Sequence, residues 1–197
     1  SKCFVMWRKG CGKTASSEYL TKIKKHDYFL VKLTFKNFPF NELYNLPDTG
    51  YTSNHQYITL WKFLIYSHVC QLMANNEKIE SSIREKLNIV YTKNQQPTLS
   101  RKINKWLDRD FGAEIFGIGI NIGKPESAEE RQKTLIERVN QLEDIIIESI
   151  DDSKYFIIFD ELDEDYKTIT EKEQFKKYTA LVTSLFKAAQ DVKSVFQ

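Results

Sequence analysis

The fold is decided by one stretch near the start of the chain, Trp7-Arg8-Lys9-Gly10-Cys11-Gly12-Lys13-Thr14. The short apolar run before it, residues 3–6, has the composition of a strand. The segment after it, residues 15–25, carries apolar residues at helical spacing. The sequence therefore predicts a strand, a glycine-rich turn and a helix in that order.

A glycine-rich turn at the start of a helix suits a triphosphate, because backbone N–H groups gathered there can bind several negative charges. Gly10 and Gly12 lack the Cβ atoms that would block close approach. We expect Lys13 to reach the β- and γ-phosphates and the Thr14 hydroxyl to ligate Mg²⁺. The expected nucleotide-binding residues are Lys9, Gly10, Cys11, Gly12, Lys13, Thr14 and Ala15. The match to G-x-x-x-x-G-K-[ST] is incomplete, since Trp7 stands where that pattern has its first glycine.

A second motif lies far along the chain, where the apolar run 155–159 ends in Asp160 and Glu161. Such a run predicts a strand buried on both faces of a parallel sheet. Asp160 is expected to hold the magnesium and its waters, and Glu161 to accept a proton from the attacking water. Residues 160–165 hold five acids in six positions, so a solvated charged loop is the alternative. The glycine-rich turn earlier in the chain favours the metal site.

These two stretches carry a resemblance to a known family. Gly10-Cys11-Gly12-Lys13-Thr14 and Phe156-Ile157-Ile158-Phe159-Asp160-Glu161 resemble the Walker A and Walker B motifs of P-loop ATPases with an additional catalytic glutamate, which include the AAA+, STAND and KAP-type ATPases. The resemblance implies ATP as ligand, Mg²⁺ as cofactor, and hydrolysis of the β–γ phosphoanhydride bond. It implies catalytic roles for Lys13 and Glu161, and magnesium ligation by Thr14 and Asp160.

The wider pattern is similar to bacterial P-loop ATPases of signalling and antiphage defence, which have a long helical insertion before the second motif. Such families also use a polar sensor and an arginine finger, often from a neighbouring subunit, and neither can be placed in this chain. The resemblance implies a homo-oligomer or an effector protein as partner.

The remaining pattern predicts one α/β domain over residues 1–197, a P-loop NTPase with a mainly parallel sheet flanked by helices and a helical insertion at 55–110. The expected strands are 28–35 and 155–159, with a short strand or hairpin at 118–122. The expected helices are 57–73, which should be largely buried, 77–90, 99–107, 127–150 and 171–191. Residues 194–196 look like the opening of a further strand, which suggests a fragment of a longer protein.

Composition restricts the partners more than the function. Hydrophobic residues make up 41% and charged residues 28% of the 197 residues, an ordinary balance for a globular protein. The net charge of +2 gives no support for a nucleic-acid partner. No apolar run approaches the roughly 20 residues that cross a bilayer, so no membrane contact is expected. Three scattered cysteines provide no disulfide framework, which favours a cytoplasmic location.

Three functions remain open at this point. The leading hypothesis is a magnesium-dependent ATPase that acts as a conformational switch or in assembly. The second is a nucleotide-sensing interaction module with little or no hydrolysis, which Trp7 keeps open. The third treats residues 160–163 as a helicase DExD box, but the long separation of the two motifs and the lack of a basic stripe count against it.

Overall fold

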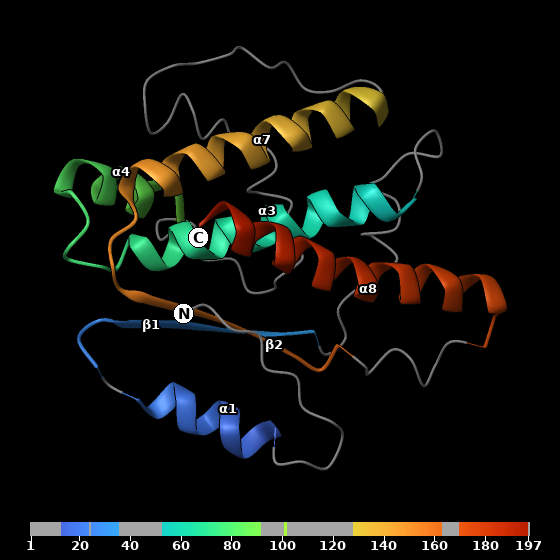
Figure 1. Ribbon diagram of the computed structural model, residues 1–197, viewed down its shortest axis with the longest axis horizontal. Coiled ribbons are helices and arrows are strands. Elements are labelled where there is room, and N and C mark those ends of the chain that lie inside the picture. The colour runs from blue at the N-terminus through green and yellow to red at the C-terminus, as the bar shows by residue number, and fades with distance from the viewer. Residues whose placement is uncertain are drawn as a thin grey trace.

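The computed structural model describes residues 13–23, 25–35, 53–91, 101, 128–162 and 170–196. These residues form an α/β structure of five helices and a two-stranded parallel sheet (Figure 1). In chain order the elements are α1 (Lys13–Lys22), β1 (Tyr28–Thr34), α3 (Ser53–Met73), α4 (Ser81–Tyr91), α7 (Ala128–Ser149), β2 (Lys154–Asp160) and α8 (Lys172–Val195).

The two strands pair in parallel although α3, α4 and α7 lie between them in the chain. The register joins Tyr28 to Lys154 at one end and Thr34 to Asp160 at the other. Two stacked aromatic pairs, Tyr28–Phe156 and Phe29–Tyr155, each with ring centroids 5.5 Å apart, link the strands. Because the strands are parallel, both end at the same edge of the sheet.

Among the described elements, the sheet separates one helix from a layer of four helices. In Figure 1, α1 lies on one side of the strands and α3, α4, α7 and α8 lie on the other. Side chains alternate between the two faces of a strand. Val31, Ile157 and Phe159 point to the α3 side and pack against the main core, whereas Lys32 and Asp160 belong to the α1 side.

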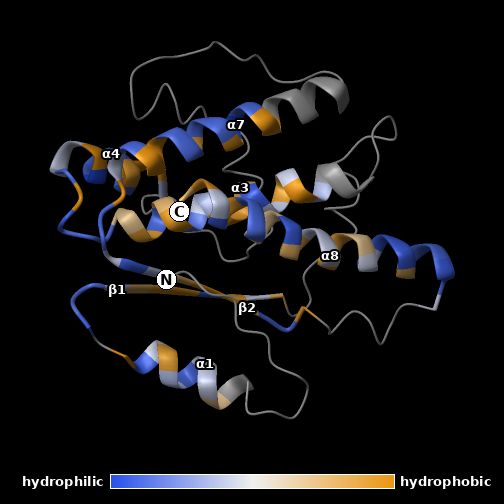
Figure 2. Cartoon of the chain, viewed as in Figure 1, coloured by the Kyte–Doolittle hydropathy of each residue, from blue (hydrophilic) through white to orange (hydrophobic). Residues whose placement is uncertain are grey.

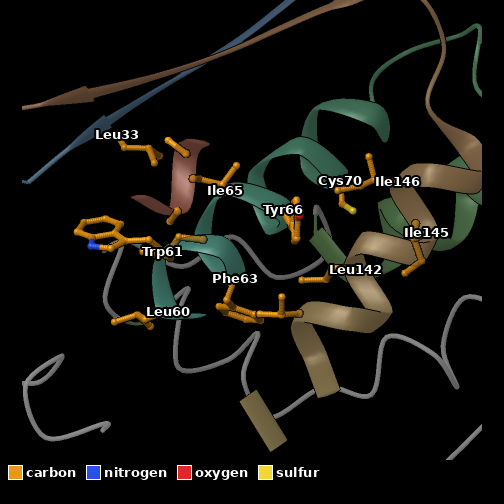
Figure 3. Close-up of a cluster of buried hydrophobic side chains, with 14 of the residues drawn as sticks. Leu33, Leu60, Trp61, Phe63, Ile65, Tyr66, Cys70, Leu142, Ile145 and Ile146 are labelled. Carbon is orange, nitrogen blue, oxygen red and sulfur yellow. The ribbon is translucent and has the colours of Figure 1, made fainter. Parts of the chain in front are cut away.

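The core is centred on α3, which contacts both strands and the helices α4, α7 and α8. Trp61, Phe63 and Tyr66 on α3 have no exposed surface (Figure 3). The Trp61 Nε1–H donates to the Leu181 carbonyl of α8 at 2.7 Å, which satisfies the indole inside the core. The expectation of a largely buried helix at 57–73 is therefore confirmed, and this part of segment 55–110 belongs to the core of the domain.

The outer helices α7 and α8 each have one apolar side, and this is why their sequences predict helices. In Figure 2 the ribbons of α7 and α8 alternate between hydrophobic and hydrophilic residues, whereas the strands are hydrophobic along most of their length. One side of α7 buries Leu142, Ile145 and Ile146 against the core. No helix in the described part of the chain is long and apolar enough to cross a lipid bilayer.

A polar cluster holds the start of β2 at the edge opposite to its C-terminal end. Asn76, in the turn after α3, donates through Nδ2 to Asp151 Oδ1 at 2.9 Å and to Tyr155 OH at 2.7 Å. Tyr155 and Ser153 also donate to the Asp151 carboxylate. Burial by itself raises the pKa of Asp151, but the hydrogen bonds from Ser153, Tyr155 and Asn76 outweigh it and hold the pKa below its ordinary value.

Three sequence expectations need correction. Residues 194–196 do not open a strand: Ser194 and Val195 continue α8, and Phe196 packs edge-on against Tyr66 with ring centroids 6.0 Å apart. The helix expected from residue 77 begins at Ser81, because the Asn76 Oδ1 accepts the Lys78 N–H at 3.0 Å and holds a turn there. The strand expected to be buried on both faces has half-buried side chains.

Other expected elements cannot be compared with the structure. The strands at 3–6 and 118–122, and the helix at 99–107 apart from Arg101, lie outside the described residues. The expected strand 28–35 and helices 127–150 and 171–191 are confirmed to within a few residues at their ends.

Candidate functional site

The candidate site lies at the edge of the sheet where β1 and β2 end. Helix α1 runs opposite to the strands, so its first turn, which begins at Lys13, lies toward this same edge (Figure 1). Asp160 is the last residue of β2, and Glu161 follows it directly. In α/β sheets, ligands bind beyond the carboxyl ends of parallel strands, because helix N-termini and loop residues meet there.

Donors from the adjacent backbone and from β1 hold the Asp160 carboxylate. Its Oδ1 accepts the Glu161 backbone N–H at 3.0 Å, and its Oδ2 lies 2.7 Å from the Lys32 Nζ of β1. The side chains of Lys32 and Asp160 are 31% and 23% exposed, so the ion pair is only partly open to solvent. Lys32 also donates to the Ser17 Oγ of α1 at 3.4 Å. A chain of contacts from α1 through β1 therefore ends at the carboxylate of β2, which is distant from both in the sequence.

The backbone turns sharply directly after the carboxylate. Glu161 has a φ of 58°, and among the described residues it is the only non-glycine residue with a positive φ. A left-handed conformation costs about 1–2 kcal/mol for a residue with a Cβ atom. The turn is held on one side by the bond to Asp160, and on the other by Tyr178 of α8, whose hydroxyl donates to the Leu162 carbonyl. Backbone strain of this kind is concentrated at functional sites.

Among the described residues, space remains between α1 and the strands that it covers. A cavity of about 370 Å³ lies between α1 and the strands, and its wall includes Leu20, Ile23, Leu30, Lys32 and Phe156. The cavity lies on the sheet face opposite to the main core. It also leaves open space beside the Lys32 side chain.

The Asp160 carboxylate is of the donor type that binds Mg²⁺. Mg²⁺ prefers hard oxygen ligands and keeps several waters or phosphate oxygens, so one or two protein ligands are sufficient. The Asp160 side chain is 23% exposed, and the backbone of Thr14 lies in the first turn of α1, which begins toward the same edge. Within the described part of the chain, no three His, Cys, Asp or Glu side chains are gathered as a metal cluster.

The structure describes the expected site residues unevenly. Lys9, Gly10, Cys11 and Gly12 lie outside the described residues, and Lys13 and Thr14 are described only in their helical backbone. Ala15 is exposed on α1. Asp160 and Glu161 are described in full and lie together at the end of β2.

Two residues of the site were missed by reasoning from the sequence. Lys32 and Ser17 contact each other and Lys32 contacts Asp160, yet neither belongs to a motif. The sequence does contain an indication for Lys32, since it is the one charged residue in the strand sequence Tyr-Phe-Leu-Val-Lys-Leu-Thr. A lone charge in a strand next to a buried core usually has a partner. Ser17 left no signal of this kind.

Comparisons with protein-family models, with curated proteins and with solved structures found no match for this chain.

Proposed function

We propose that this chain binds ATP with Mg²⁺ through residues 9–15 and hydrolyses it, using the reaction to drive a conformational switch or assembly. The observation that carries the proposal is the arrangement at the sheet edge, where β2 ends at Asp160, Glu161 follows, and toward which α1 begins at Lys13. The glycine-rich turn in the sequence immediately precedes that helix start.

Each residue has a separate task in this proposal. Lys13 and the amides of residues 9–15 bind the β- and γ-phosphates and stabilise the charge that develops on them. Thr14 and Asp160 hold Mg²⁺, which supplies charge neutralisation for the phosphate oxygens. Glu161 orients the attacking water and accepts its proton.

The conformation of Glu161 supports its assignment as the base. Its strained backbone is tied to the Asp160 carboxylate by the hydrogen bond from its own N–H. A base and a metal ligand that share such a link keep a constant relative position, which general-base catalysis requires. A solvated acidic loop needs no strained residue, so the strain favours a functional role.

Binding and turnover of ATP by the purified protein test the proposal when they are measured on the same variants. We expect wild type to bind a fluorescent ATP analogue and to release phosphate in the presence of Mg²⁺. Lys13→Ala should lose binding, whereas Glu161→Gln should bind and release no phosphate. The matched control is Lys22→Ala, which removes the same charge from the exposed last residue of α1 and should behave as wild type.

Two other results would change the conclusion. If wild type binds the analogue but releases no more phosphate than Glu161→Gln, with or without ATP-dependent assembly, the chain is a nucleotide-sensing module. If wild type and Lys13→Ala bind equally poorly with Mg²⁺ present, nucleotide binding by this chain is refuted.

A further inference from the structure

We propose that Lys32 is a built-in counter-ion of Asp160, which holds the carboxylate in the nucleotide-free protein and releases it when magnesium nucleotide binds. Lys32 would then control how strongly nucleotide binding depends on Mg²⁺. This proposal rests on the proposed function, because it concerns the same carboxylate.

The first argument is which oxygen Lys32 occupies. Asp160 Oδ1 already accepts the Glu161 N–H at 3.0 Å. The Lys32 Nζ lies 2.7 Å from the other oxygen, Oδ2, on the sheet face that α1 covers. Lys32 therefore holds the carboxylate oxygen that does not accept the Glu161 N–H.

The second argument is the charge balance at that oxygen. An ammonium group and Mg²⁺ compete for the same carboxylate lone pairs, and the two cations repel each other strongly when only a few ångströms apart. In the structure the ammonium compensates a carboxylate whose side chain is only 23% exposed. Once a divalent cation compensates the charge of that carboxylate, the ion pair no longer stabilises the Lys32 ammonium in this position. Repulsion between the two cations then displaces the ammonium group.

The third argument is that Lys32 has somewhere to go. Its side chain lines the cavity of about 370 Å³ between α1 and the sheet. Ser17 Oγ already lies 3.4 Å from the Lys32 Nζ and can keep an ammonium hydrogen bond after the carboxylate is released. A lysine carries its charge on a flexible four-carbon stem, so this movement needs only side-chain rotation.

A purely structural role is the competing explanation, in which the ion pair only joins β1 to β2. Both explanations predict some loss of stability when Lys32 is neutralised. They differ in one quantity, which is the ratio of nucleotide affinity with saturating Mg²⁺ to nucleotide affinity in EDTA. A structural ion pair affects both affinities alike and leaves the ratio unchanged.

The experiment measures that ratio with a fluorescent ATP analogue for wild type, Lys32→Met and Lys154→Met. The Lys154 variant is the control, because it removes the same charge from the same sheet face at the opposite end of the strands. We expect the ratio to rise about fivefold in Lys32→Met, because the loss of a partly exposed ion pair changes an equilibrium constant by up to about fivefold. In Lys154→Met the ratio should stay at the wild-type value. Lys32→Gln, which is neutral and polar, replaces Lys32→Met if that variant fails to fold.

A double-mutant cycle adds a check on the partner. In the Asp160→Asn background, neutralising Lys32 should have no further effect on the ratio, because the carboxylate is already absent. An unchanged or lower ratio in Lys32→Met overturns the counter-ion role while the proposed function stands. If instead wild type shows no magnesium-dependent nucleotide binding and matches Lys13→Ala, the proposed function fails and the counter-ion role fails with it.

Discussion

Replacing Asn76 by alanine tests how the start of β2 is anchored. Asn76 is only 2% exposed, and its side chain joins the turn after α3 to the segment that leads into β2. The hydrogen bond to the Asp151 carboxylate, at 2.9 Å, contributes about 2 kcal/mol because its acceptor is charged. The bond to the Tyr155 hydroxyl, at 2.7 Å, contributes about 1 kcal/mol. We therefore expect Asn76→Ala to lower the free energy of unfolding by about 3 kcal/mol.

The assay is urea unfolding followed by far-UV circular dichroism at pH 7, with Asn75→Ala as the control. Asn75 is the exposed neighbour, and its Nδ2 donates to the Gln71 carbonyl at 3.0 Å on the surface. An exposed bond of this kind is worth little, so the control should lose less than about 0.5 kcal/mol. The comparison separates the buried cluster from the general effect of an Asn→Ala change in this turn.

The pH dependence gives the same reasoning a second test. Because the pKa of Asp151 is below its ordinary value in the folded protein, its stabilising effect is present above the unfolded pKa of about 4 and is lost as the pH falls through the lower folded pKa. The difference between wild type and Asn76→Ala should therefore be largest near pH 7 and smaller near pH 3. The reasoning is refuted if Asn76→Ala costs no more than Asn75→Ala, or if its cost is the same at both pH values.

Three further changes can be measured in the same unfolding assay. Glu161→Gly should be about 0.5–1 kcal/mol more stable than Glu161→Gln, because glycine adopts a φ of 58° without a Cβ clash; equal stabilities would show that this backbone is not strained. Trp61→Phe should lower the free energy of unfolding by about 2 kcal/mol, because the buried Leu181 carbonyl loses its hydrogen-bond donor at 2.7 Å. A loss under about 0.5 kcal/mol would contradict that hydrogen bond. Leu142→Ala should lower the free energy of unfolding by about 3 kcal/mol, because it leaves a cavity in the core. The control is Ile147→Ala, which should lower it by less than about 1 kcal/mol because Ile147 is 53% exposed. Similar losses would argue against the core position of Leu142.

Local patterns were the most readable part of the fold. The apolar periodicity at 57–73, 127–150 and 171–191 predicted helices that the structure contains. A helix that buries one side has apolar residues that recur about every 3.6 positions, so the pattern is visible in the sequence. The strand ending at Asp160 was equally clear, since an uninterrupted apolar run followed by acids marks the point where the chain leaves the core. These features depend on neighbours within a few positions.

Features that depend on the packing of distant segments were misjudged. Residues 194–196 have strand-like composition, yet Phe196 reaches Tyr66 because α8 continues to Val195 and packs along α3. Likewise, the composition of residues 155–159 predicts burial on both faces. Among the described elements, however, only α1 covers one side of the sheet, and a cavity remains there. Which partner a segment meets is not encoded in its own pattern.

The sequence by itself determined the order of the described helices and strands and the position of the acidic pair at the end of β2. Both follow from local hydrophobic spacing and from where that spacing stops. Only the tertiary structure decided that β1 pairs with β2 and that Lys32 meets Asp160. The physical reason is that the parallel register places these two residues on one face of the sheet, two positions apart along the ladder, although they are distant in the chain.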